Sequence, residues 1–142
     1  MIYIIILGVI MYWIAVIDIK HGLIPWQLLC FGFITILIQY IIENQSIIQP
    51  LMNSLVVTFS LHSFRLLLNA IYHKDTLGMG DIHLLAVIAF GFNDIGMTLY
   101  VLAIGSYIAL FFMLIYKKKQ VSFGPFLLLS TLGVMMYQIF FS

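Results

Sequence analysis

Long apolar runs fill this chain, and short polar segments interrupt them. Of the 142 residues, 64% are hydrophobic and only 8% are charged, which is far from the composition of a soluble domain. Because so little charge cannot cover a water-facing surface, we expect lipid to be the solvent. The length suits a single domain over residues 1–142, since one domain typically needs 100 to 200 residues. The net charge of +1 gives no basis for nucleic-acid binding.

Six apolar segments are predicted to form transmembrane helices in one all-α bundle. A helix needs about 20 predominantly apolar residues to cross the hydrocarbon layer. Proline is favoured in the first turn of a helix, so we expect Pro25 to open the second one. The predicted segments are 1–17, 25–42, one from about 50 to 72, 82–92 with its polar start at 78–81, 95–116, and one that enters at 121–125 and runs to about 141.

The fourth apolar segment is unusually short. A helix from Ile82 to Phe92 covers roughly 17 Å at ~1.5 Å per residue, against a hydrocarbon layer of about 30 Å. Either this helix continues past Asn93 and Asp94, or its start lies below the headgroups. The second alternative places residues 78–81 within the membrane profile, where irregular backbone is tolerated only beside protein or a water-filled cavity.

Lysines mark one side of the predicted bundle. They lie in the first, third and fifth loops, at Lys20, Lys74 and 117–119, whereas the second and fourth loops contain none. By the positive-inside rule the odd loops are cytoplasmic and both termini face outward. The chain is therefore expected to be a multi-pass membrane protein, and the family resemblance described below implies the inner, or cytoplasmic, membrane. Asp18 and Asp81 then come to the same cytoplasmic side.

A Gly-Met-Gly-Asp segment precedes the fourth apolar run and ends at Asp81. An ionisable group at the mouth of a membrane helix is costly and indicates a functional site by default. Gly78 and Gly80 let the backbone turn tightly and approach a neighbour closely, because no Cβ blocks it. Alone, this four-residue motif has little specificity, and it gains weight from a second acid at the same depth, for which Asp18 is the candidate.

Two carboxylates at one depth can share a proton. Repulsion and desolvation favour keeping that proton, so at neutral pH one acid is neutral and the other charged. The charged acid can deprotonate a water and the neutral one can protonate a peptide carbonyl, which is general acid–base hydrolysis without a covalent intermediate. Asp18 taken alone is equally well explained as a helix-end acid near the interface. Asp75 and Asp94 are expected to be solvated loop groups.

Other polar residues have ordinary explanations beside functional ones. His62, Arg65 and Asn69 are spaced three and four apart, so they share one helix face. Arg65 either extends to the interface while the other two meet neighbouring helices, or the three help to shape an aqueous cavity. Cys30 lies in an apolar run and is expected to be a small buried hydrophobe.

The histidines do not form a recognisable metal-ligand motif. His21, His73 and His83 match no spacing of known zinc sites. We therefore expect neither a metal nor another cofactor.

Three segments of the chain, taken in order, resemble the motifs of one family. They are Asp18 followed by Ile24-Pro25, then Gly-Met-Gly-Asp-Ile-His-Leu-Leu-Ala at 78–86, then Phe-Gly-Pro-Phe-Leu at 123–127. Together they resemble the type IV prepilin peptidases, which are GxGD aspartyl proteases of the inner membrane. The resemblance implies that Asp18 and Asp81 are the catalytic pair. It implies cleavage of short leader peptides from prepilin or pseudopilin substrates on the cytoplasmic side, with Gly78, Gly80 and Pro25 positioning backbone and substrate.

The chain departs from the family pattern in three places. Many bacterial members begin with an extra helix and a cytoplasmic domain with paired Cys-x-x-Cys motifs, associated with N-methylation. This chain has only Cys30 and resembles the short forms without that domain. Trp26 stands where the family often has Asn or Asp, and His83 where it often has Lys. Neither is expected to touch the acids, and both are expected to alter either the contacts with substrate or the tuning of the acids' pKa values.

Two other classes of function remain open from the residues. A transporter or proton channel would use Asp18 and Asp81 as intramembrane titratable sites, although the sequence lacks the paired broken helices usual in secondary transporters. A non-catalytic assembly subunit of a pilus or competence machine would need neither acid for chemistry.

Overall fold

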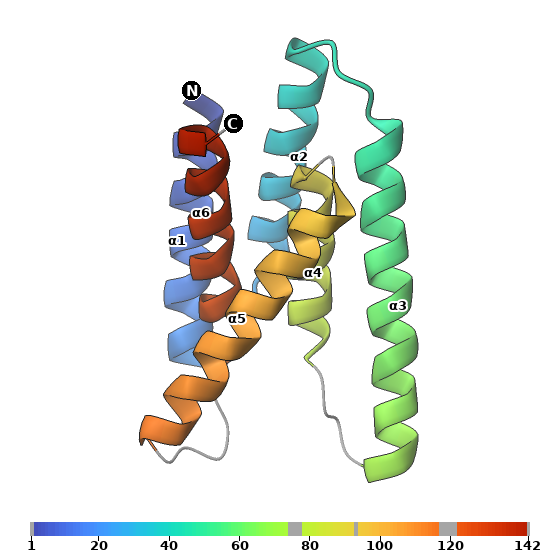
Figure 1. The fold of residues 1–142 in the computed structure, drawn as a ribbon, viewed down its shortest axis with the longest axis vertical. Coiled ribbons are helices and arrows are strands. Elements are labelled where there is room, and N and C mark those ends of the chain that lie inside the picture. The colour runs from blue at the N-terminus through green and yellow to red at the C-terminus, as the bar shows by residue number, and fades with distance from the viewer. Residues whose placement is uncertain (1, 74–77, 93, 117–121, 142) are drawn as a thin grey trace.

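The chain is all α-helical in this computed structural model, which describes residues 2–73, 78–92, 94–116 and 122–141. Six helices follow one another within these ranges (Figure 1). They are α1 (Ile2–His21), α2 (Trp26–Ile42), α3 (Ile48–Tyr72), α4 (Met79–Gly91), α5 (Ile95–Tyr116) and α6 (Gly124–Phe141). The predicted all-α class and the order of the helices are confirmed.

Local sequence signals set most of the helix ends. Gly22 adopts a φ of 64° and ends α1, as expected of a glycine just past a helix. Pro25 precedes α2 as its N-cap, and its carbonyl accepts the N–H groups of Leu28 and Leu29. The main difference lies in α1, which runs past the predicted end at Ile17 to His21. The helix continues through the polar residues that follow Ile17, so Asp18 is part of it.

Helix α4 is the centre of the bundle. It packs against α2, α3, α5 and α6, whereas α1 packs against α2 and α6, and α5 packs chiefly against α6. Six of its 13 residues are buried. These are Ile82, Leu84, Leu85, Ile88, Ala89 and Phe90. A helix without a polar face is expected at such a position, because every side of it meets protein.

The short α4 does not span the depth of its neighbour α3. Its 13 residues cover roughly 20 Å, and the 25 residues of α3 cover roughly 38 Å, at ~1.5 Å per residue. The helix ends at Gly91, and Phe92 is extended, so the alternative in which it continues past Asp94 is wrong; Asn93 lies outside the described residues. Figure 1 shows α4 beginning well inside the lower end of α3. Residues 78–81 therefore lie at an inset level of the bundle.

Small and polar side chains tie the helices together. Ser54 and Asn53 of α3 donate hydrogen bonds to the carbonyls of Ala86 (2.8 Å) and Phe92 (3.4 Å). Gly105 of α5 is buried, and a Cβ there would lie 3.1 Å from the Ser130 Oγ of α6. The small residue at this position therefore lets α5 and α6 approach each other closely.

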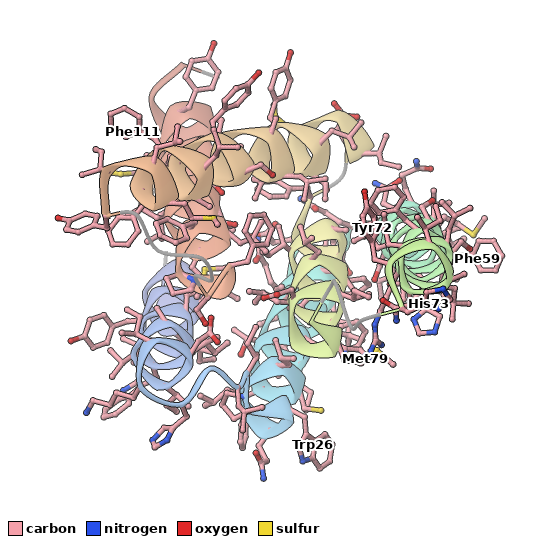
Figure 2. All side chains as sticks on the ribbon, turned by 90° about the horizontal axis from the view of Figure 1, so that it is seen from below. Trp26, Phe59, Tyr72, His73, Met79 and Phe111 are labelled. Atoms are coloured by element: carbon pink, nitrogen blue, oxygen red, sulfur yellow. The ribbon has the colours of Figure 1, made fainter. Side chains whose placement is uncertain are left out.

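The outer surface of the bundle is apolar. Helices α3 and α5 are long and apolar enough to cross a membrane, and only 6% of the apolar window of α3 is buried in the bundle. A core helix of a soluble protein would be mostly buried instead. Figure 2 shows Phe59 of α3 and Phe111 of α5 pointing away from the other helices. The other apolar helices, α2, α4 and α6, are shorter.

The expectation that Cys30 is buried is wrong, because its side chain is exposed on α2. Apolar sequence marks a position as compatible with lipid or with protein, and it does not distinguish the two.

The ends of the helices alternate between two sides of the bundle. The starts of α2, α4 and α6 lie toward the lower side of Figure 1, and both chain ends lie at the upper side. This arrangement agrees with the prediction that odd and even loops lie on opposite sides of the bundle. Lys20 is described and exposed at the lower side, whereas Lys74 and 117–119 lie outside the described residues. Which side faces the cytoplasm remains a prediction from the lysines.

We predict that alkaline phosphatase fused after Ser142 is enzymatically active and that a fusion after His73 is inactive. The enzyme folds only outside the cytoplasm, and the lysine distribution places the chain ends outside and the third loop inside. Phosphatase activity normalised to the amount of fusion protein in the membrane measures this. An active fusion after His73 together with an inactive fusion after Ser142 would show the opposite topology.

Candidate active site

Asp18 is a buried acid in the last turn of α1. Its side chain is only 3% exposed, so the explanation as an interfacial helix-end acid does not fit. The hydroxyl of Ser122 and the backbone N–H of Gly124 act as hydrogen-bond donors to its carboxylate. Its Oδ2 is buried and has no hydrogen-bond partner among the described residues. One carboxylate oxygen is thus left without a protein partner in a closed environment.

Asp81 lies in the first turn of α4 and is half-buried. The negative charge of Asp18 acts on its carboxylate, so the two acids lie close enough to repel each other. They come from helices that share two neighbours, because α1 and α4 both pack against α2 and α6. This arrangement agrees with the prediction that Asp18 and Asp81 lie at the same end of the bundle, and their action as one pair stays a prediction.

Ile24 lies between the two helix starts that carry this site. A Cβ on Gly80 would lie 3.0 Å from the Cβ of Ile24, and a Cβ on Gly124 would lie 3.3 Å from its Cδ1. Pro25 follows directly and restricts Ile24 to an extended backbone, since the proline ring disfavours the helical region for the preceding residue. Pro25 therefore positions the backbone by fixing Ile24 against α4 and α6.

The two glycines of the Gly-x-Gly-Asp motif provide space. A Cβ on Gly78 would lie 2.9 Å from Oδ2 of Asp81, so the absent side chain leaves room for that carboxylate. Gly78 has a φ of −64°, and Gly22 is the described glycine with positive φ. Neither motif glycine therefore has the positive φ that glycine adopts most readily, and the tight-turn interpretation stays a prediction because residues 74–77 lie outside the described residues. The close-approach interpretation is confirmed, with Asp81 and Ile24 as the approaching groups.

The remaining polar candidates lie around this pair. Arg65 turns toward the start of α4, where its Nη1 donates a hydrogen bond of 2.7 Å to the Met79 sulfur, and His62 and Asn69 are half-buried on the same face. Asp94 is exposed and accepts the N–H of Gly96 at 2.9 Å, as a loop acid does. Asp75 lies outside the described residues.

The two departures from the family pattern line one apolar groove. Trp26, Cys30 and His83 share it with residues of α2, α3 and α4, and its volume is about 580 Å³. Figure 2 shows Trp26 pointing outward from the start of α2. His21 and His73 are exposed, and among the described residues no three of the His, Cys, Asp and Glu side chains cluster in a way that suits a metal ion.

Three residues near Asp18 had no individual role in the sequence-based interpretation. Ile24 and Gly124 belong to segments that carry the family resemblance, but their proximity joins distant parts of the chain. Ser122 had no sequence signal beyond its place two residues before Gly124. The hydrogen bond from its hydroxyl to the backbone carbonyl of Asp18 measures 3.3 Å.

Fold and site together define a helical, membrane-type bundle with a coupled pair of aspartates at one end. The model of the type IV leader peptidase family matches residues 5–114. The chain belongs to this family, which is membrane-bound. The matched segment contains Asp18 and Asp81 and ends before α6. No curated protein and no solved structure gives a significant match to the chain.

We predict that Gly80→Ala lowers the free energy of unfolding by about 1–3 kcal/mol, the usual cost of forcing extra volume into a packed site. The added methyl would meet the Cβ of Ile24, which is fixed to the backbone and cannot swing away. The thermal unfolding midpoint in detergent measures the effect. Gly133→Ala is the matched control, because nothing lies within 4 Å of a Cβ there. Equal midpoints for the two variants would refute the packing argument.

Proposed function

We propose that this chain is an aspartic-type endopeptidase that cuts leader peptides from prepilin-like proteins at the cytoplasmic side of the membrane. The observation that carries the proposal is the pair of Asp18, which is buried, and Asp81, which lies within range of its charge. Membership of the leader peptidase family supports the substrate class. In this proposal the six helices all cross the membrane and form one domain.

The pair suits general acid–base hydrolysis. The ionised aspartate takes a proton from a water, and the resulting hydroxide attacks the scissile carbonyl carbon while the protonated aspartate gives its proton to the carbonyl oxygen. The tetrahedral intermediate then collapses: the acid that took the first proton delivers it to the leaving amine, and the other aspartate takes back its proton from a hydroxyl of the intermediate as the carbonyl re-forms. No covalent enzyme intermediate and no cofactor is needed for this sequence of steps.

The inset start of α4 suits a substrate that is itself anchored in the membrane. Asp81 lies in the first turn of a helix that begins inside the lower end of α3 (Figure 1). A leader on the cytoplasmic side with an apolar segment held in lipid would place its cleavage site at this level. The charge distribution of the loops supports the cytoplasmic assignment of that side.

A transporter or proton channel is less well supported. Protons would need polar groups leading from the acids to the other side of the membrane. The described part of α4 beyond Asp81 instead buries an apolar series that continues to Phe90. A non-catalytic assembly subunit would explain neither the buried charge of Asp18 nor the space kept at Gly78.

We predict that Asp18→Asn and Asp81→Asn each reduce cleavage by at least about 10²–10⁴-fold, the contribution of a general acid or base. The double variant should be no slower than either single variant, because members of one catalytic unit are strongly non-additive. Purified protein is incubated with a prepilin, and mass spectrometry follows the shortened product.

Asp94→Asn is the matched control for the aspartate variants. This acid is exposed beyond the other end of α4 and accepts the N–H of Gly96 in the first turn of α5, so the substitution should keep most of the activity. Near-full cleavage by Asp18→Asn would remove Asp18 from the proposed pair and leave Asp81 with another partner.

We predict a bell-shaped dependence of kcat on pH. Cleavage needs one ionised and one protonated aspartate, so the rate should fall when both are protonated and again when both are ionised. The two apparent pKa values belong to the pair and not to either residue. Initial rates across a pH series test this, and a rate that rises to a plateau without an alkaline fall would exclude the requirement for a protonated acid.

A further inference from the structure

The N-terminal end of α6 lies against the buried acid of α1. The backbone N–H of Gly124 donates to the carboxylate of Asp18, and the single hydroxyl proton of Ser122 serves either that carboxylate or the backbone carbonyl of Asp18. These residues follow the segment matched by the family model, which ends at residue 114. They are 104 residues or more from Asp18 in the chain.

A buried carboxylate needs such donors. Asp18 is 3% exposed, and a charge removed from water is costly unless hydrogen bonds compensate it. The first N–H groups of a helix have no partners within the helix, and they carry the positive end of the helix dipole. The α6 start therefore supplies both hydrogen bonds and favourable charge at this point.

Gly124 is needed because of space. A Cβ at this position would collide with Oδ2 of Asp18 and press against Ile24. Alanine favours a helix more than glycine does, so helix formation does not require glycine here. The requirement comes from the carboxylate, which occupies the volume that a side chain would fill.

We propose that Ser122 and Gly124 are positioning residues that orient the Asp18 carboxylate and support its ionised form. The inference rests on the proposed peptidase function. From the elements around Asp18, the described groups that act at this carboxylate are Ser122 and Gly124 at the start of α6, together with the titratable Asp81 of α4. Because Asp81 shares the proton, a change at Ser122 alters how the pair titrates.

The first test replaces the hydroxyl of Ser122. Ser122→Ala should lower kcat about 10- to 100-fold, the range for a hydrogen bond to a charged group, with KM little changed because the hydroxyl does not touch substrate. The acidic limb of its pH–rate profile should move to higher pH, since the ionised carboxylate has lost a donor. Ser122→Thr keeps the hydroxyl and should restore both the rate and the limb.

The second test uses two glycines of the same helix. Gly124→Ala places a methyl where Oδ2 of Asp18 lies, whereas Gly133→Ala meets nothing within 4 Å. We expect Gly124→Ala to lose at least as much activity as Ser122→Ala, and Gly133→Ala to keep wild-type activity. Thermal midpoints in detergent show whether each variant folds, and a Gly124→Ala chain that fails to fold leaves the decision to the two serine variants.

The outcomes separate this inference from the function beneath it. If Asp18→Asn is inactive while Ser122→Ala has the wild-type rate and pH profile, the positioning role is overturned and the peptidase proposal stands. A Ser122→Thr variant as slow as Ser122→Ala also overturns the role, because it shows a packing effect. A wild-type chain that leaves prepilin uncut overturns the proposed function and this inference with it.

Discussion

The burial of the Asp18 carboxylate is the constraint on which this end of the bundle depends. A charge in an apolar bundle is unfavourable unless donors surround it. The start of α6 supplies donors, from Ser122 and Gly124. Gly124 has no side chain where Oδ2 lies, and Ile24 closes the space between this glycine and Gly80. The packing of three helix ends is thus arranged around one acid.

The second acid follows from the shortness of α4. Because this helix has only 13 residues, its first turn lies at an inset level where Asp81 can reach the field of Asp18. Gly78 keeps room for the Asp81 carboxylate, and hydrogen bonds from Ser54 and Asn53 hold the other part of α4 against α3. Contacts with neighbouring helices fix the position of each acid. The fold can therefore hold two like charges close together.

Much of this arrangement could be predicted from the sequence, because polar breaks end apolar helices. The bounds of α5 agree with the prediction. The positions of the lysines indicated that Asp18 and Asp81 lie on the same side of the membrane. The exposure of Cys30 could not be predicted, because lipid and protein accept the same apolar side chains. The role of Ser122 was invisible because its partner is 104 residues away and no local pattern encodes that contact. For Gly78 and Gly80 the sequence indicated small residues, and only the packing shows what fills the space.

The most direct measurement of the central claim is the proximity of the two acids in the membrane. Asp18→Cys and Asp81→Cys are combined in a Cys30→Ser background, which removes the single native thiol, and treated with a short thiol cross-linker. After this treatment, the protein is labelled with a maleimide. Loss of labelling at both cysteines reports a link between them within one chain. The account predicts an efficient link for this pair and none for Asp18→Cys with Asp94→Cys, at the opposite end of α4. Two thiols that each react with maleimide but do not link to each other would contradict the pairing of Asp18 with Asp81.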